Sequence, residues 1–126
     1  MNESENIQII FSPVSSAEIS ALPKDLQLEI LAEFNVIQPN FVEKNSDKFG
    51  VMKSEARTLF RYRTREYRIY FEQRDEGLYI QRVIHKNTLK DFLFRSNVQL
   101  AEDEELQKNP NFWKMIDHPE SGNPKN

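Results

Sequence analysis

The chain of 126 residues contains no cysteine and only two histidines, and this scarcity excludes several kinds of chemistry. Without cysteine there is no disulfide framework, no thiolate metal site and no cysteine nucleophile. Two histidines leave a zinc site dependent on carboxylates, and no metal-ligand spacing is present, so we expect neither a metal nor another cofactor. No apolar stretch approaches the roughly 20 residues that span a bilayer, and the acidic start MNESENIQII lacks the basic segment of a signal peptide. We therefore expect a cytoplasmic protein with no membrane partner.

The aromatic residues compensate for a polar composition. Hydrophobic residues make up 38% of the chain and charged residues 29%, but nine Phe, four Tyr and one Trp are enough to seed a core. The chain is therefore not expected to be disordered along its length. A length of 126 residues indicates one domain.

The net charge of −3 conceals a strong difference between the middle of the chain and its ends. Residues 51–95 hold eleven Lys or Arg and six Asp or Glu, a charge of +5, whereas the other residues hold six and 14, a charge of −8. Eight of the eleven cations are arginine, whose planar guanidinium suits phosphate. A basic middle between acidic ends favours an anionic partner. A solvated basic surface, or a docking surface for an acidic protein, explains the charge equally well.

The first part of the chain predicts a strand followed by two helices. Residues 7–12 (IQIIFS) are rich in β-forming side chains, and Pro13 ends this strand. Ser15 or Ser16 is expected to cap a short helix, and Pro23 separates it from a second one. In the second helix an apolar stripe recurs every four residues and is expected to face the core. Its members are Leu26, Ile30 and Phe34.

The second part of the chain predicts a β-meander. Residues 38–50, which precede it, have no clear period and are interpreted as a loop. Residues 59–63, 67–73 and 78–85 alternate between apolar and polar side chains and are joined by short turns, as in three consecutive antiparallel strands. Gly77, in the second turn, is free to take a positive φ.

Alternation along these strands places arginines together on one face of the expected sheet. Arg61 and Arg63 share one face of their strand, and Arg68 is expected on the same face of the next strand, opposite Ile69 and Phe71. Directly opposed side chains of adjacent strands have Cβ atoms about 5 Å apart. Guanidinium groups clustered at that distance destabilise a fold unless an anion is the occupant. The pattern therefore predicts an anion-binding site on this face.

The remainder of the chain divides into a short helix, an acidic extension and a polar tail. Residues 88–95 are expected to form the helix, and residues 96–117 are interpreted as an acidic helical extension. The apolar anchor of the extension consists of Phe112, Trp113 and Ile116. The extension also carries the carboxylates Asp103, Glu104 and Glu105. We interpret them as a solvated helix face rather than a metal site. Residues 1–6 and 118–126 are expected to be disordered.

The stretch LFRYRTREYRIYFEQRDEGLYIQRVIHKNTLKDF resembles the RelE/ParE toxin superfamily. The resemblance is carried by a basic strand (Arg61–Arg63), a Tyr-Arg pair that opens the next strand (Tyr67–Arg68) and a strand-end turn (Val83–Lys86). It covers residues 7–95, a toxin-like domain, and implies a small single-domain α+β fold of the RelE type. Such a fold has an N-terminal strand, a helical pair, a three-stranded antiparallel meander and a C-terminal helix.

The chain departs from the RelE pattern at three positions. Ile84 stands where glycine is common, Lys86 where arginine is common, and Phe92 where a catalytic tyrosine often lies. The chain is also acidic overall, whereas ribosome-dependent toxins tend to be basic. The acidic extension has no counterpart in the pattern.

The resemblance implies the toxin of a type II toxin–antitoxin pair, with a cognate antitoxin protein as its partner. RelE-like members cleave messenger RNA at the ribosome, so the implied activity is a metal-independent endoribonuclease that inhibits translation, with the ribosome and mRNA as further partners. The implied catalytic residues are Arg61, Arg63, Arg68, His85 and Lys86. The implied RNA-binding residues are Tyr70, Lys90, Phe92 and Arg95.

These residue types fit metal-free RNA cleavage. A base removes the proton of a 2′-hydroxyl, the oxygen attacks the adjacent phosphorus, and the 5′-oxygen leaves with a proton. Guanidinium groups stabilise the extra negative charge of the transition state, and His85 has an ordinary pKa near neutrality. Each residue also has a structural alternative: Arg68 pairs with Glu72 on its own strand, Arg61 and Arg63 are solvated, and His85 is a strand-end histidine with satisfied hydrogen bonds.

Other functions also fit the sequence. One is a non-enzymatic ParE-like toxin that inhibits DNA gyrase, and another is a degenerate toxin that acts only by binding its antitoxin. Phe92 in place of tyrosine favours both of these, whereas the retained Arg-x-Arg, Tyr-Arg and His-Lys pairs favour the nuclease. A stand-alone RNA-binding domain fits less well, because the aromatic platform motifs of the common RNA modules are lacking.

Overall fold

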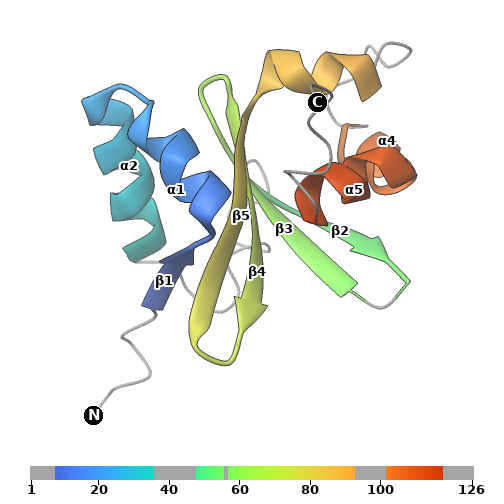
Figure 1. Cartoon of the computed structure of the whole chain (residues 1–126), viewed down its shortest axis with the longest axis horizontal. Coiled ribbons are helices and arrows are strands. Elements are labelled where there is room, and N and C mark those ends of the chain that lie inside the picture. Colours follow the sequence, from blue (N-terminus) through green and yellow to red (C-terminus); the bar gives the residue numbers. More distant parts are fainter. Residues whose placement is uncertain (1–7, 36–47, 56, 93–101, 118–126) are drawn as a thin grey trace.

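Five strands form one mixed sheet with helices on both of its faces, the α+β class that the sequence predicts (Figure 1). The computed structural model describes residues 8–35, 48–55, 57–92 and 102–117, with residues 91 and 92 described by their backbone alone. The elements in chain order are β1 (Gln8–Phe11), α1 (Pro13–Ser20), α2 (Lys24–Asn35), β2 (Phe49–Ser54), β3 (Arg57–Thr64), β4 (Tyr67–Arg74), β5 (Gly77–His85), the 3₁₀-helix η2 (Lys86–Phe92), α4 (Glu102–Gln107) and α5 (Pro110–Asp117). Within the described ranges, no helix has both the length and the apolar character needed to cross a bilayer.

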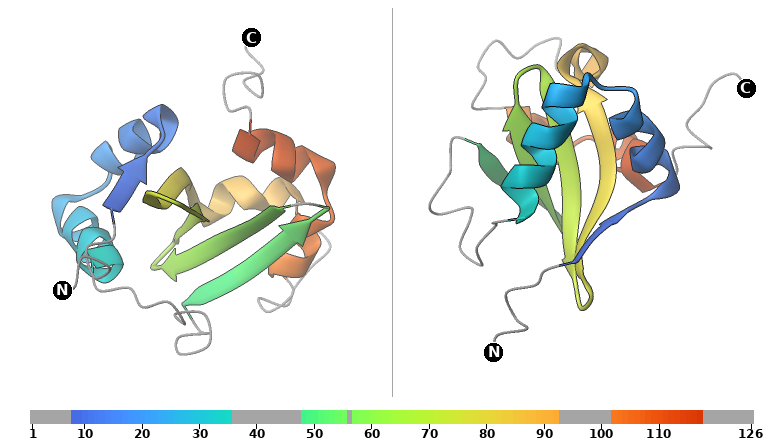
Figure 2. Two further views of the ribbon diagram at one scale, coloured as in Figure 1. Left: turned by 90° about the horizontal axis from the view of Figure 1, so that it is seen from below. Right: turned by 90° about the vertical axis from the view of Figure 1, so that its left-hand side faces the viewer.

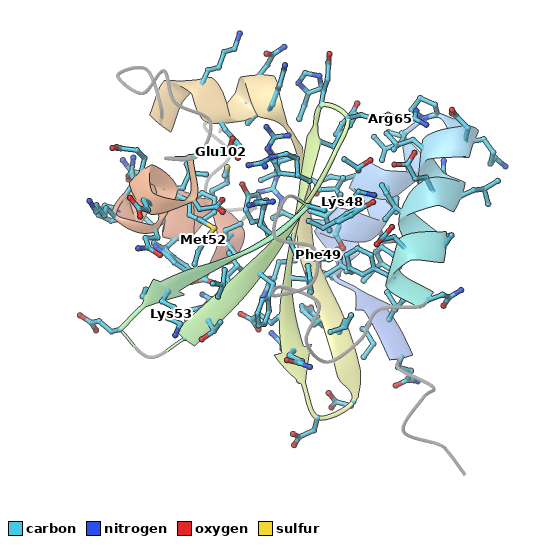
Figure 3. All side chains as sticks on the ribbon, turned by 180° about the vertical axis from the view of Figure 1, so that it is seen from behind. Lys48, Phe49, Met52, Lys53, Arg65 and Glu102 are labelled. Atoms are coloured by element: carbon cyan, nitrogen blue, oxygen red, sulfur yellow. The ribbon has the colours of Figure 1, made fainter. Side chains whose placement is uncertain are left out.

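The predicted meander is confirmed, and the sheet extends beyond it on both sides. The strand order is β1-β5-β4-β3-β2, in which β3, β4 and β5 pair antiparallel and β1 runs parallel to β5. Strand β2, antiparallel to β3, was not predicted, and its first two residues fall in the expected loop 38–50. The pattern hides β2 because Phe49 packs into the core on one face and Met52 into the core on the other, so its buried residues do not keep to one face (Figure 3).

The start of α1 differs from the sequence prediction. Ser12, rather than Ser15 or Ser16, is the N-cap, and its hydroxyl accepts a hydrogen bond from Ser15 N at 3.0 Å. Pro13 occupies the first helical turn, where its missing N–H costs nothing. The helix therefore begins where the strand ends, and Ser15 instead donates to Ile80 O at 2.8 Å, which ties α1 to β5.

The turn after β4 depends on a glycine, as predicted. Gly77 has φ 149°, and a Cβ at this position would overlap the carbonyl oxygen of Gln8. Gln8 is the register partner of Gly77 in the parallel pair of β1 and β5. Glycine is thus required both for the turn and for the close approach of β1.

The first face of the sheet carries the core that the helical stripe predicts. The side chains of Leu26, Ile30 and Phe34 are at most 2% exposed and pack with the sheet residues Ile69 and Phe71. The rings of Phe34 and Phe71 meet edge to face with centroids 4.9 Å apart. Helices α1 and α2 therefore lie on this face, as the predicted alternation of β4 requires (Figure 2).

The second face carries a separate core, under helices α4 and α5 (Figure 2). Leu106, Phe112 and Ile116 are buried there, and Trp113 packs against them partly buried. The predicted apolar anchor of the extension, Phe112, Trp113 and Ile116, is therefore confirmed. They pack against the sheet and η2 residues Met52, Leu59, Tyr70, Ile84 and Leu89. The expected helix at 88–95 is a 3₁₀-helix that begins at Lys86, and residues 93–95 lie outside the described residues, as do the expected disordered ends 1–6 and 118–126.

A candidate anion site under the C-terminal helices

The three strand arginines converge on the second face, as predicted from alternation. Arg63 and Arg68 are directly opposed across the β3–β4 hairpin, and Arg61 is opposed to Tyr70 in the next pair on the same face. Burial and the positive charges of Arg61 and Arg68 lower the pKa of Arg63 below its ordinary value. The cluster is therefore strongly electropositive and favours an anion.

The anion is supplied by the chain itself. Arg68 grips Glu102 with two hydrogen bonds, from Nε to Oε2 at 2.9 Å and from Nη2 to Oε1 at 3.3 Å. Arg61 grips Asp103 in the same way, from Nη2 to Oδ2 at 2.7 Å and from Nε to Oδ1 at 3.2 Å. Figure 3 labels Glu102, the first residue of α4, where this helix meets the sheet. Two consecutive carboxylates thus bind two arginines of adjacent strands in fork-to-fork geometry.

These ion pairs are buried, which makes their partners interdependent. Arg61 is 3% exposed, Arg68 4% and Glu102 6%. Removal of one partner from such a pair leaves an uncompensated charge in a low-dielectric environment. The interpretation of Asp103 as part of a solvated helix face is therefore wrong, although Glu104 and Glu105 of the same helix are exposed. The alternative that Arg68 pairs with Glu72 is also wrong, because Glu72 binds Arg57 and Arg74 instead.

Gly50 makes room for the pair between Arg61 and Asp103. It is the register partner of Arg61 across β2 and β3. A Cβ on Gly50 would overlap Arg61 Nη2 and Asp103 Oδ2. Since the positive-φ glycine among the described residues is Gly77, the backbone at position 50 does not itself need glycine. Glycine is needed at position 50 because a larger residue would fill the space that the Arg61–Asp103 pair occupies.

Tyr70 lies beneath this cluster with an unsatisfied hydroxyl. Its side chain is fully buried, and its Oη has no hydrogen-bond partner among the described residues. Burial raises the pKa of Tyr70 well above its ordinary value, so the phenol stays protonated and remains a donor. The ring meets Phe112 of α5 edge to face at 5.2 Å. The ring of Tyr70, predicted to stack on an RNA base, is therefore covered by Phe112 and cannot stack on a base while α5 is in place.

The other predicted site residues do not join the arginines. His85 is the register partner of Tyr67, on the face opposite to that of Arg68, which pairs with Ile84. Both of its ring nitrogens are engaged: Asn87 N donates to Nδ1 at 3.0 Å, and Nε2, which then carries the proton, bonds Glu66 Oε1 at 3.0 Å. This is the geometry of a structural strand-end histidine, and a catalytic role for it stays a prediction.

The remaining predicted residues lie on or beyond η2. Lys86 and Lys90 are exposed on this helix. The side chain of Phe92 and the whole of Arg95 lie outside the described residues. Of the predicted residues whose side chains the structure describes, the strand register brings together Arg61, Arg63, Arg68 and Tyr70.

Sequence reasoning missed the two carboxylates that complete the site. The signal was present in the charge distribution, since a predicted anion site and an acidic extension stood in one chain. What was missing was the orientation of α4, which depends on how Leu106 and the α5 anchor pack against the sheet. Nowhere in the described part of the chain do three or more His, Asp or Glu side chains form a group able to hold a metal ion.

Comparison with known proteins places the fold. No family model matches the chain, and no curated protein matches it. A chain of the archaeal RelE–RelB complex from Pyrococcus horikoshii OT3 superposes with a TM-score of 0.52 at 15% identity, over 64% of this chain and 96% of that one. A chain of the RelB–RelE antitoxin–toxin complex from Methanococcus jannaschii gives a TM-score of 0.44 at 17% identity, over 66% and 96%. The first of these shows a shared fold, and the RelE-like fold class predicted from sequence is confirmed.

Proposed function

We propose that the chain is the toxin of a toxin–antitoxin pair and that its arginine cluster binds the backbone of mRNA for cleavage at the ribosome. The observation that carries the proposal is the pair of fork-to-fork contacts of Arg61 and Arg68, each of which holds two oxygens of one anion. A phosphodiester offers guanidinium the same two-oxygen geometry. The shared fold with a chain of a RelE–RelB complex and the Arg-x-Arg and Tyr-Arg pairs support the toxin side of such a system.

The cluster fits one part of the cleavage reaction. The 2′-oxygen attacks the adjacent phosphorus and the bond to the 5′-oxygen breaks. A cyclic phosphate results, and the departing 5′-oxygen takes a proton from water to become a 5′-hydroxyl. Arg61, Arg63 and Arg68 stabilise the added negative charge, and the protonated Tyr70 donates a hydrogen bond to a phosphate oxygen. Since His85 faces the other side of the sheet, the proton of the 2′-hydroxyl passes to water or to a group of the ribosome.

The test compares two arginines of the same strand. Arg68→Lys keeps the charge but loses the two-pronged contact, whereas Arg74→Lys makes the same change at an exposed arginine that binds Glu72. With wild type expressed without its partner, we expect growth arrest and ribosome-dependent cuts in a reporter message, read by primer extension. Arg68→Lys should reduce cleavage about 100-fold, the scale of one lost transition-state donor, and Arg74→Lys should leave it unchanged.

A second candidate is a toxin-like protein that binds its partner protein without cleaving RNA. The observation in its favour is that the arginines are already buried and ion-paired. Growth arrest without cuts, with inhibited DNA supercoiling by gyrase, would assign the chain to the gyrase-targeting class. Absence of growth arrest, with arrest caused by the partner instead, would place the chain on the antitoxin side.

A further inference from the structure

We propose that α4 is a built-in anionic plug, which holds the arginine site closed until RNA displaces it. The inference rests on the proposed function, because it treats Glu102 and Asp103 as occupants of positions that RNA phosphates take in the open state. It adds a conformational step to that function: the described conformation is the closed one, and the site opens by departure of α4.

The two carboxylates of α4 match the two arginines that they bind. Glu102 and Asp103 are neighbours in sequence and bind arginines of neighbouring strands, so both positive groups are neutralised by one turn of helix. The hydroxyl of Tyr70, buried beside the cluster, receives no hydrogen bond partner from α4 or from any other described residue. The carboxylates therefore satisfy the arginines but leave one donor unused, which an anion with more oxygens would engage.

Helix α4 depends more on ion pairs than α5 does. Helix α4 has six residues, too few to be stable without tertiary contacts. Besides its ion pairs it has Leu106 in the core and two hydrogen bonds at Gln107. Gln107 Oε1 accepts from Lys53 N at 2.9 Å, and Gln107 O accepts from Trp113 Nε1 of α5 at 2.9 Å. The ion pairs are thus a large share of what keeps α4 on the sheet.

Helix α5 has its own attachments. Asn109 caps it, with Oδ1 accepting from Asn111 N at 2.9 Å. Arg82 Nη1 donates to Met115 O at 3.0 Å, and Arg57 binds Asp117. These three contacts do not involve α4, and one further hydrogen bond, from Trp113 Nε1 to Gln107 O at 2.9 Å, joins α5 to the end of α4. Helix α5 therefore keeps its own attachments when the ion pairs of α4 break.

The experiment uses two charge-matched variants of the full chain. Glu102→Gln with Asp103→Asn removes the two carboxylates that bind the arginines, whereas Glu104→Gln with Glu105→Gln removes two exposed ones from the same helix. Binding of a labelled single-stranded RNA 10-mer is measured by fluorescence anisotropy. We expect the first variant to bind about 10-fold more tightly than wild type, because the apparent affinity scales with the open fraction. The control should stay within about 2-fold, as a matched change in net charge alone does little to a site that stays closed.

A second measurement follows the closure without RNA. Phenylglyoxal modifies accessible guanidinium groups, and mass spectrometry reports each arginine, with the exposed Arg74 as an internal standard. We expect Arg61 and Arg68 to react slowly in wild type and in the control, and at least 10-fold faster in the first variant. Gly50→Ala, whose Cβ displaces the Arg61–Asp103 pair from the side of β2, should give an intermediate rate even if the double variant fails to fold.

The two measurements test closure by α4 and binding of RNA independently. Fast modification of Arg61 and Arg68 in the first variant, without any RNA binding, supports closure by α4 and overturns the RNA function. Tight RNA binding by wild type, with modification unchanged in every variant, supports the RNA function and overturns the plug. Equal tightening by both double variants also overturns the plug, because it traces the effect to net charge.

Discussion

The two faces of the sheet are built on different physical terms, although the same strands supply both. The face under α1 and α2 is closed by aliphatic and aromatic packing, with Phe34 set among Tyr62 and Phe71. The face under α4 and α5 combines an apolar anchor with two buried ion pairs. Apolar packing favours one closed state, whereas a buried ion pair depends on each partner and is open to exchange for another anion. The first face is therefore suited to stability and the second to exchange.

The largest effect is expected from an unpaired charge on the second face. Arg68→Ala leaves Glu102 buried without its partner and should lower the free energy of unfolding by about 3–5 kcal/mol. Arg68→Met combined with Glu102→Leu should recover most of that loss, because no charge is then left behind. Urea denaturation measures both, and a loss below about 1 kcal/mol for the single variant would show that Glu102 is solvated rather than buried.

The next comparison truncates one anchor on each face. Ile30→Ala on the first face should cost about 2–5 kcal/mol and lower hydrogen-exchange protection throughout the sheet. Ile116→Ala on the second face should lower protection mainly in α4 and α5. An equal fall in protection across the strands in both variants would mean that the two faces unfold as one unit.

Each face of the sheet has a buried tyrosine whose ionisation at alkaline pH should destabilise the fold: Tyr62 on the first face and Tyr70 on the second. Burial and the charge of Glu33 raise the pKa of Tyr62 to about 12, and burial raises that of Tyr70 well above its ordinary value. Both raised values stabilise the fold fully below about pH 10, the unfolded value, and that contribution is lost as the pH rises toward the folded values. Tyr62→Phe and Tyr70→Phe should each raise the alkaline unfolding midpoint, followed by circular dichroism. An unchanged midpoint in either variant would contradict the burial of that tyrosine.

The smallest effect is expected at the cap of α1. Ser12→Ala removes the hydroxyl that accepts from Ser15 N and should cost about 1 kcal/mol. Ser16→Ala is the matched control, since Ser16 is exposed and was the alternative cap in the sequence prediction. If both variants lower the thermal denaturation midpoint equally, Ser12 is not the main N-cap of α1.

The sequence predicted the first face well and the second only in part, for a physical reason. The stripe of Leu26, Ile30 and Phe34 and the alternation of Ile69 and Phe71 are local periodicities, and local periodicity is enough to choose a face. Glu102 is different, because its role depends on a contact with Arg68 that spans 34 residues. Local pattern carries no information on such pairings.

The candidate site shows the same division. Arg61, Arg63 and Arg68 were placed together correctly because strand parity fixes their face. His85 was grouped with them by its position at a strand end, but the register of β5 against β4 turns it to the other face. Strand β2 was missed because both of its faces are buried at Phe49 and Met52.

The hydrogen bond from Lys53 N to Gln107 connects the plug with the rim of the sheet. Strand β2 is the last strand in the sheet order, so Lys53 N faces outward from an edge, and α4 blunts that edge with a side-chain amide. Unpaired backbone groups on an edge strand are a template for another strand. Departure of α4, as proposed for the open state, would therefore expose a basic face and, at the same time, the N–H of Lys53 on an edge strand.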